Sequence, residues 1–135
     1  MSEQSQNDAK KILIVDSDKF LVGMYSVKFE SRGFEVDSAT SSVDALKKLR
    51  DDKVFDIILL DIVMPDESGM EFLRTVRRDN LCPDTTVIIL TNETKSSKIE
   101  EAKNLKAAGY IVKSTSIPSE VFDEVVKIHA ARKNK

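Results

Sequence analysis

Three short runs of branched apolar residues divide the chain, at residues 12–15, 57–60 and 87–90. Each run is apolar at every position rather than at alternate ones, which is typical of a strand that is covered on both faces in a parallel sheet. Residues 34–39 alternate between apolar and polar side chains and predict an edge strand, while residues 110–112 are a short candidate for the opposite edge. The sequence therefore predicts a sheet of about five strands.

Segments with helical spacing lie between these predicted strands. Apolar residues recur there every three or four positions: Leu21, Met24, Tyr25 and Phe29; Val43, Leu46 and Leu49; Met70, Leu73 and Val76; Ile99, Ala102 and Leu105; Val121, Val125 and Ile128. Ser42 and Ser97 are predicted helix caps, Gly33 and Gly109 are predicted to follow helix ends, and Pro118 is predicted to begin the last helix. The alternation predicts an α/β fold, a three-layer α/β/α sandwich built from right-handed βα units.

Charge and cysteine content limit the binding partners and the cellular location that the sequence predicts. The 21 basic and 23 acidic side chains balance, so the composition gives no electrostatic footprint for direct nucleic-acid or membrane binding. Cys82 is the single cysteine, which excludes a disulfide framework and a thiolate metal cluster and favours a reducing, cytoplasmic location. We expect a disordered N-terminal tail at residues 1–9, one domain at residues 10–131, and a C-terminal tail at residues 132–135.

Polar residues follow four of the predicted strands. In chain order they are Asp16, Ser17 and Asp18, then Asp61, then Thr91 and Asn92, and then Lys113. Ligands of open parallel sheets bind outside the carboxyl ends of the strands, so these side chains are expected to meet at one edge of the sheet. Carboxylates, a hydroxyl and an ammonium suit phosphoryl transfer, in which the protein mainly positions the group and neutralises its charge.

Each of these residues has a predicted role in that chemistry. Asp16 and Asp61 can hold Mg²⁺, because this ion binds one or two carboxylates, keeps several waters and takes phosphate oxygens as further ligands. Asp61 is the better phosphate acceptor, because it ends a central strand before a proline-ended loop, and a carboxylate there can form an aspartyl phosphate. Thr91 would hydrogen-bond a phosphoryl oxygen, and Lys113 would supply a compact positive charge.

These motifs resemble those of receiver domains of two-component response regulators. The matching stretches are Ile-Leu-Ile-Val-Asp at 12–16, Ile-Leu-Leu-Asp-Ile-Val-Met-Pro at 58–65 with Gly69 after it, Val-Ile-Ile-Leu-Thr-Asn at 87–92, and Ala-Ala-Gly-Tyr-Ile-Val-Lys at 107–113. The resemblance covers roughly residues 10–130 and implies a flavodoxin-like fold with strand order 2-1-3-4-5. It also implies that Asp61 is the phosphorylated residue, that Mg²⁺ is the cofactor, and that the only catalysis is self-catalysed phosphoryl transfer and dephosphorylation.

The resemblance also implies partners and further site residues. The phosphate donor would be a sensor histidine kinase or a phosphotransfer protein, and the signal would pass to a downstream protein through a change involving Thr91 and Tyr110. The implied metal ligands are Asp16, Asp61, the backbone carbonyl of Val63, and the position of Ser17. Few residues follow the last predicted helix, so we expect a stand-alone receiver, either monomeric or dimeric on phosphorylation.

The chain departs from the receiver pattern at two positions. Ser17 stands where most receivers have a second acid, and a neutral hydroxyl beside a dication predicts weaker Mg²⁺ binding. Asp18 is expected to cap the following helix rather than to replace that acid. Ser114 follows Lys113 where proline is usual, often after a cis bond, so the loop either takes another path or holds a strained bond.

Two other functions stay open at this point. Asp16-Ser-Asp18 resembles the opening motif of haloacid-dehalogenase-like phosphatases, with Asp16 as the nucleophile, although that interpretation leaves Asp61 unused. The departures at Ser17 and Ser114 favour a receiver fold that acts as a phosphorylation-independent interaction module. Tyr110 is equally explained as a half-buried aromatic of an edge strand, and His129 as a solvated or partly packed helix residue without a role.

Overall fold

The structure is a computed structural model that describes residues 9–66 and 68–133. Its strands form one parallel sheet in the order β2-β1-β3-β4-β5. The strands are β1 (Lys11–Val15), β2 (Glu35–Ala39), β3 (Ile57–Leu60), β4 (Thr86–Thr91) and β5 (Gly109–Val112). The predicted fold class and strand order are confirmed, with the alternating segment β2 at one edge of the sheet and β5 at the other.

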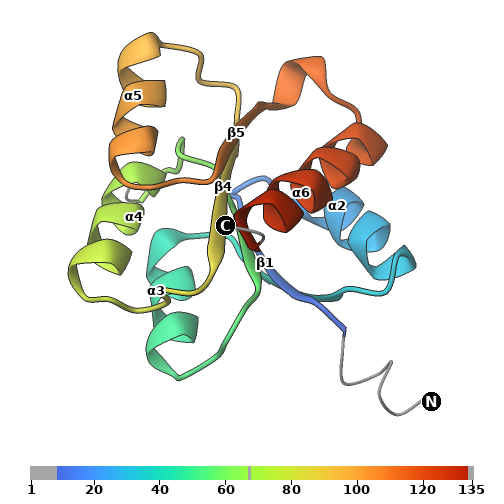
Figure 1. The fold of residues 1–135 in the computed structure, drawn as a ribbon, viewed down its shortest axis with the longest axis horizontal. Helices are drawn as coiled ribbons and strands as arrows, with labels where there is room; N and C mark the ends of the chain where they lie inside the picture. Colours follow the sequence, from blue (N-terminus) through green and yellow to red (C-terminus); the bar gives the residue numbers. More distant parts are fainter. Residues whose placement is uncertain (1–8, 67, 134–135) are drawn as a thin grey trace.

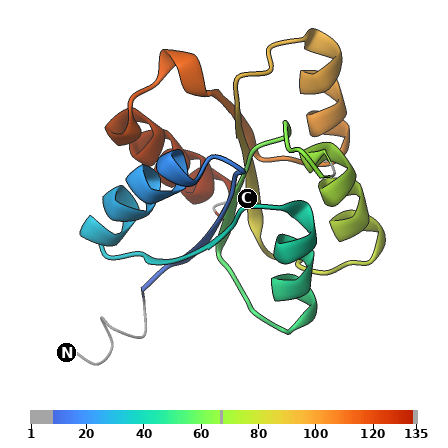
Figure 2. The same cartoon turned by 180° about the vertical axis from the view of Figure 1, so that it is seen from behind.

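Helices cover both faces of this sheet. They are α2 (Lys19–Ser31), α3 (Ser42–Arg50), α4 (Gly69–Arg78), α5 (Ser96–Asn104) and α6 (Pro118–Lys133), with a short 3₁₀ turn, η1 (Lys113–Thr115), after β5. Figure 1 shows α2 and α6 together on one side of the sheet and α3, α4 and α5 on the other, and the reverse view in Figure 2 agrees. No helix in the described part of the chain is long and apolar enough to cross a membrane.

Two apolar cores hold the three layers together. Successive residues of a strand point to opposite faces, so Ile12 and Ile14 of β1 pack under α2 and α6, while Leu13 and Val15 pack under α3, α4 and α5. Every residue of β3 is at most 1% exposed. Burial of one such side chain is worth about 1.5–3 kcal/mol, so the central strands are anchored from both sides. This anchoring fixes where each strand ends.

Helix caps agree with the sequence at one position and differ at two. Asp18 caps α2, because its Oδ1 accepts hydrogen bonds from the backbone N–H groups of the helix's second and third residues. The predicted cap Ser42 is wrong: Ser41 is the N-cap of α3 and its hydroxyl accepts from the N–H of Asp44 at 3.1 Å. Ser97 is also not a cap, since α5 begins at Ser96 after Lys95, which offers no capping side chain.

The predicted helix ends are also partly confirmed and partly wrong. Gly33 has a φ of +90° directly after α2, as its position predicted, and Pro118 begins α6. Gly109 does not end α5, because Lys106 takes the left-handed conformation there with a φ of 64°, and Gly109 instead begins β5. The last helix runs to Lys133, so the predicted tail at 132–135 is wrong for its first two residues, and its last two lie outside the described residues. The predicted tail at 1–9 lies outside them too, except for Ala9.

His129 is more buried than its sequence position indicated. It lies in α6 with 8% of its surface exposed, and its Nδ1 is 2.8 Å from the hydroxyl of Thr86 in β4. That hydroxyl also accepts a bond from Arg132, and it donates its own proton to Nδ1 in the tautomer of the neutral ring that carries its proton on Nε2. Within the described structure, this buried Nε2 has no hydrogen-bond partner. The packing of α6 on β4 therefore depends on the protonation of His129, and burial favours the uncharged imidazole by lowering its pKa.

This dependence predicts a loss of stability in mild acid. Burial lowers the pKa of His129. The positive charges of Lys10, Lys133 and Arg132 lower this pKa further, whereas the negative charge of Asp56 raises it. Below about pH 6.5 the unfolded state thus binds more protons than the folded state, and the free energy of unfolding falls with decreasing pH. Urea unfolding measured at several pH values below about 6.5 should show that the free energy of unfolding decreases with pH in the unchanged protein. This decrease should be smaller in His129→Gln, by the contribution of the imidazole. Parallel pH curves for the two proteins would contradict the assignment.

Candidate functional site

Two carboxylates lie side by side at the carboxyl edge of the sheet because β1 and β3 end in register. Val15 pairs with Leu60, and the residues that follow them are Asp16 and Asp61. The N–H of Asp61 donates to the carbonyl of Val15 at 2.9 Å, which extends the ladder one step beyond the strands. Asp16 and Asp61 are only 3% and 7% exposed. The continuous apolar runs thus place two nearly buried acids next to each other.

Lys113 bridges these two acids. Its Nζ lies 2.6 Å from Oδ2 of Asp16 and 2.8 Å from Oδ2 of Asp61, and 10% of its side chain is exposed. Burial alone would lower the pKa of Lys113, but the hydrogen bonds to Asp16 and Asp61 outweigh burial and raise it above its ordinary value. The ammonium is therefore firmly charged, and the three side chains together retain one negative charge.

The other carboxylate oxygen of Asp61 accepts two hydrogen bonds. Its Oδ1 accepts from the hydroxyl of Thr91 at 2.8 Å and from the N–H of Val63 at 2.9 Å. Thr91 is completely buried and ends β4, so its hydroxyl is held in place by the sheet. Asp61 consequently has a fixed orientation, with a hydroxyl and an amide on one oxygen and an ammonium on the other. The structure brings together all four residues predicted to carry the chemistry.

The oxygen donors at this site suit Mg²⁺ in kind. Two adjacent carboxylates are the usual protein contribution to a site at which Mg²⁺ keeps several waters. Asp18 adds no third acid, because its carboxylate caps α2, and the described residues contain no cluster of three acidic, histidine or cysteine side chains arranged for a metal. Ser17 is half-buried directly after Asp16, and Val63 contacts Asp61 through its amide, so the roles of Ser17 and of the Val63 carbonyl stay predictions.

The loop after Lys113 takes a path that needs no cis peptide. Residues Lys113–Thr115 form a 3₁₀ turn, and the described residues contain no cis bond. The N–H of Ser114 donates to Oδ1 of Asn92 at 2.8 Å, a contact between the ends of β4 and β5. Of the two paths that the sequence left open, the chain takes the unstrained one. The role of Asn92 was missed, because nothing in the sequence links it to a residue 22 positions away.

Tyr110 reaches from β5 to the loop that follows Thr91. Its hydroxyl donates to the backbone carbonyl of Glu93 at 2.6 Å, and its ring is half-buried. Burial, followed by the nearby Glu93 and Asp61, raises the pKa of Tyr110, so the hydroxyl stays protonated as the donor. Glu93 was also missed by sequence reasoning, although its carboxylate accepts from the N–H groups of the two residues after it and so shapes this loop.

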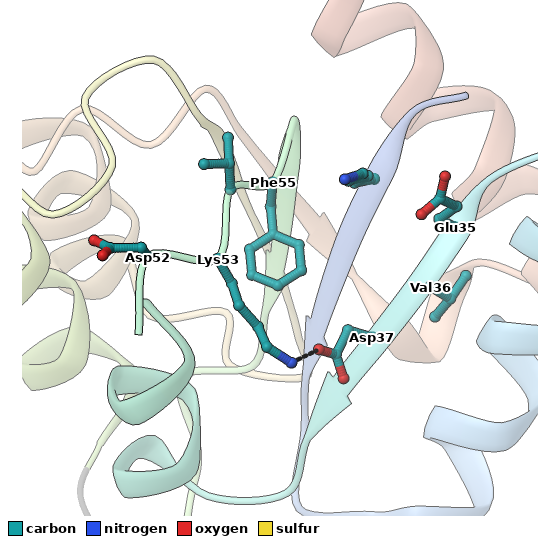
Figure 3. A pocket seen from close by; sticks show the side chains of 8 residues that line it. Glu35, Val36, Asp37, Asp52, Lys53 and Phe55 are labelled. Atoms are coloured by element: carbon teal, nitrogen blue, oxygen red, sulfur yellow. Dashed lines mark hydrogen bonds and ion pairs between the residues drawn. The ribbon is translucent and has the colours of Figure 1, made fainter. Parts of the chain in front are cut away.

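A hollow lies at the opposite end of the sheet and shares no lining residue with this site. Figure 3 shows its lining side chains, which come from the start of β1, from β2 and from the segment that precedes β3. There the ammonium of Lys53 points to the carboxylate of Asp37 at 3.4 Å, and Lys48 also pairs with Asp37. These ion pairs connect the end of α3 to the edge strand, and we assign them to stability rather than to chemistry.

Comparison with known proteins decides the family. The sequence profile of the response regulator receiver domain matches residues 12–124. The chain belongs to this family. The receiver is 36% identical over 105 residues to the response regulator SaeR of Staphylococcus epidermidis, a match that covers 78% of this chain and 44% of SaeR. The chain thus spans less than half the length of this relative.

Solved structures agree with the fold of the receiver. The CheY-like receiver domain protein of Methanospirillum hungatei has a TM-score of 0.85 at 26% identity, over 94% of this chain and 98% of that one. The response regulator TrrA of Thermotoga maritima, solved in complex with Mg²⁺-BeF, has a TM-score of 0.75 at 29% identity, over 89% and 98% of the two chains. Family membership argues against the phosphatase alternative, in which Asp16 rather than Asp61 would be the nucleophile.

Gly69 is required by the loop that follows Asp61. Its N–H donates to the carbonyl of Ile62, and a Cβ at this position would lie 2.6 Å from the Cα of Ile62 and closer still to the carbonyl oxygen of Asp61. These are backbone atoms, so they cannot turn aside as a flexible side chain would. The glycine therefore allows α4 to begin against the loop that follows Asp61.

We predict that Gly69→Ala destabilises the receiver by about 2–3 kcal/mol, because the clash forces the backbone apart. Gly23→Ala is the matched control: Gly23 lies inside α2, and a Cβ added there would meet no atom within 4 Å, so alanine should stabilise by about 0.5–1 kcal/mol. Chemical denaturation of both variants measures the two changes. Equal stabilities for Gly69→Ala and the unchanged protein would refute the role of this glycine.

Proposed function

We propose that this receiver accepts a phosphoryl group on Asp61 from a histidine kinase or a phosphotransfer protein, with Mg²⁺, and passes the signal to a downstream protein in the cytoplasm. The observation that carries the proposal is the Lys113 ammonium held between Asp16 and Asp61 at 2.6 and 2.8 Å. A structural ion pair would need only one acid. A second buried acid at the same ammonium suits a site that binds a cation and phosphoryl oxygens.

The site residues divide the work of phosphoryl transfer. An oxygen of Asp61 forms the new bond to phosphorus as the bond between phosphorus and the donor breaks, which gives an aspartyl phosphate. Lys113 then neutralises charge on the transferred group, and Thr91 donates its hydroxyl to one of its oxygens. Mg²⁺, held by Asp16 and Asp61 with the Val63 carbonyl and waters, would neutralise further charge on the same oxygens.

Transfer requires the resting contacts of Asp61 to be exchanged. Both carboxylate oxygens accept hydrogen bonds, Oδ1 from Thr91 and Val63, and Oδ2 from Lys113. After transfer, Thr91 and Lys113 would move from the carboxylate to the larger phosphoryl group. The carboxylate contacts and the phosphoryl contacts thus define two states of the β4 and β5 ends.

The signal would follow from the preference of the phosphoryl group for one of these states. Thr91 and Tyr110 are the proposed switch residues, because Thr91 touches Asp61 and Tyr110 holds the loop that follows Thr91 through its bond to the Glu93 carbonyl. A modification shifts such an equilibrium only by its differential free energy for the two states. The downstream protein would bind the favoured state, with the receiver monomeric or dimeric.

Replacement of the phosphoacceptor tests the proposal directly. We predict that Asp61→Asn abolishes the addition of phosphate when the protein is incubated with Mg²⁺ and acetyl phosphate, because the amide is not a comparable nucleophile. Intact-mass spectrometry measures the adduct. Loss of labelling in Asp16→Asn but not in Asp61→Asn would instead favour the phosphatase chemistry. An unmodified wild-type protein would favour the phosphorylation-independent interaction module.

Restoration of an acid at position 17 tests the metal site. We predict that Ser17→Asp tightens Mg²⁺ binding by about tenfold, because a third carboxylate adds a strong electrostatic contribution beside the dication. A Mg²⁺ titration followed by NMR gives both affinities, and Ser17→Ala serves as the control that removes the hydroxyl without adding charge. An unchanged affinity in Ser17→Asp would place this position outside the metal shell.

A further inference from the structure

A side-chain contact joins the two strand ends that hold Asp61. Thr91 ends β4 and Lys113 follows β5, and the residues directly after them, Asn92 and Ser114, are hydrogen-bonded through Asn92 Oδ1 and the Ser114 N–H at 2.8 Å. An N–H can be met only by an acceptor, so the contact fixes which way the Asn92 amide points. The strand pairing ends at Thr91 and Val112, and this contact continues the connection one step further.

The contact also satisfies a backbone group that the local structure leaves open. Ser114 is the second residue of the 3₁₀ turn η1, where N–H groups have no partner within the turn. The residue before the turn is Val112, whose side chain cannot cap it. Asn92 therefore acts as a capping residue supplied by another strand, and it anchors the first turn after β5 to β4.

The anchored turn contains Lys113 itself. Lysine has several rotatable bonds, so its ammonium reaches two carboxylates reliably only if its backbone is held. With the Asn92 contact, the structure forms a closed ring: Asp61 binds Thr91 through Oδ1 and Lys113 through Oδ2, and the neighbours of those two residues bind each other. Removal of one link opens the ring on the side of Lys113 only, because Thr91 stays fixed within β4.

We propose that Asn92 is a positioning residue that acts through Ser114 to aim the Lys113 ammonium at Asp61. The geometry is independent of function, whereas the consequence for phosphorylation rests on the function proposed above. Neither Asn92 nor Ser114 contacts Asp16 or Asp61 in the hydrogen bonds of the described residues, so the effect on chemistry passes through Lys113. Metal binding uses the two acids and not the ammonium, so it should not weaken when the contact is lost.

The first experiment needs no phosphate donor. In Asn92→Ala, the Ser114 N–H should exchange with solvent about tenfold faster, and the ¹⁵N signal of the Lys113 ammonium, visible only while the carboxylates hold it, should weaken. Asn92→Asp keeps an acceptor oxygen and should retain both signals. Ser114→Ala keeps the backbone N–H and should also behave like the unchanged protein. An unaltered Lys113 signal in Asn92→Ala overturns the proposal.

The second experiment separates chemistry from metal binding. Labelling of Asp61 by acetyl phosphate at saturating Mg²⁺ should be about fivefold slower in Asn92→Ala, the effect expected for the loss of one exposed hydrogen bond. The Mg²⁺ affinity of Asn92→Ala should not fall, and Ser114→Ala should label at the normal rate. An equal labelling rate, or a parallel loss of Mg²⁺ affinity, overturns the positioning role. If the unchanged protein is not labelled, the proposed function fails, while the amide and ammonium signals still decide for or against the Asn92 contact.

Discussion

The ion bridge from Lys113 to Asp16 and Asp61 is the constraint on which the site depends. Two nearly buried carboxylates at adjacent strand ends repel each other when both are charged. The Lys113 ammonium between the two carboxylates offsets their repulsion. A buried ion bridge nevertheless adds little net stability, because its charged groups lose their hydration. The arrangement is therefore retained at a stability cost that the two apolar cores offset, which is the pattern of a functional site.

The apolar cores also determine the precision of this site. The residues of β3 are buried on both faces, so the strand cannot slide without exposing one core residue and burying a polar one. The same holds for β1, and the register between the two strands fixes the spacing of Asp16 and Asp61. By contrast, Lys113 lies after the short edge strand β5, and its position depends on contacts outside the sheet.

This difference explains what the sequence could and could not predict. The three central strands, the residues at their ends and the meeting of Asp61 with Thr91 follow from continuous apolar runs, which are readable without coordinates. The Asn92–Ser114 and Tyr110–Glu93 contacts join separate segments through single polar atoms, and no periodicity records them. The end of α5 was predicted wrongly for a related reason: Lys106 adopts a left-handed conformation that glycine usually supplies, so the nearby Gly109 was misplaced at the helix end.

With the proposed function, the neutral residue at position 17 would change the balance between the ammonium and a metal ion. With two acids and one ammonium, the site retains one negative charge, whereas a third acid would leave two. The smaller residual charge lowers the cost of burying the three side chains together and would weaken the attraction for a dication. A dication that approached Asp16 would also compete with Lys113 for the same oxygen atom, Oδ2. The bond from Lys113 to Asp61, rather than the bond to Asp16, is therefore the one that the fold must hold in position, and the anchored turn after β5 serves that bond.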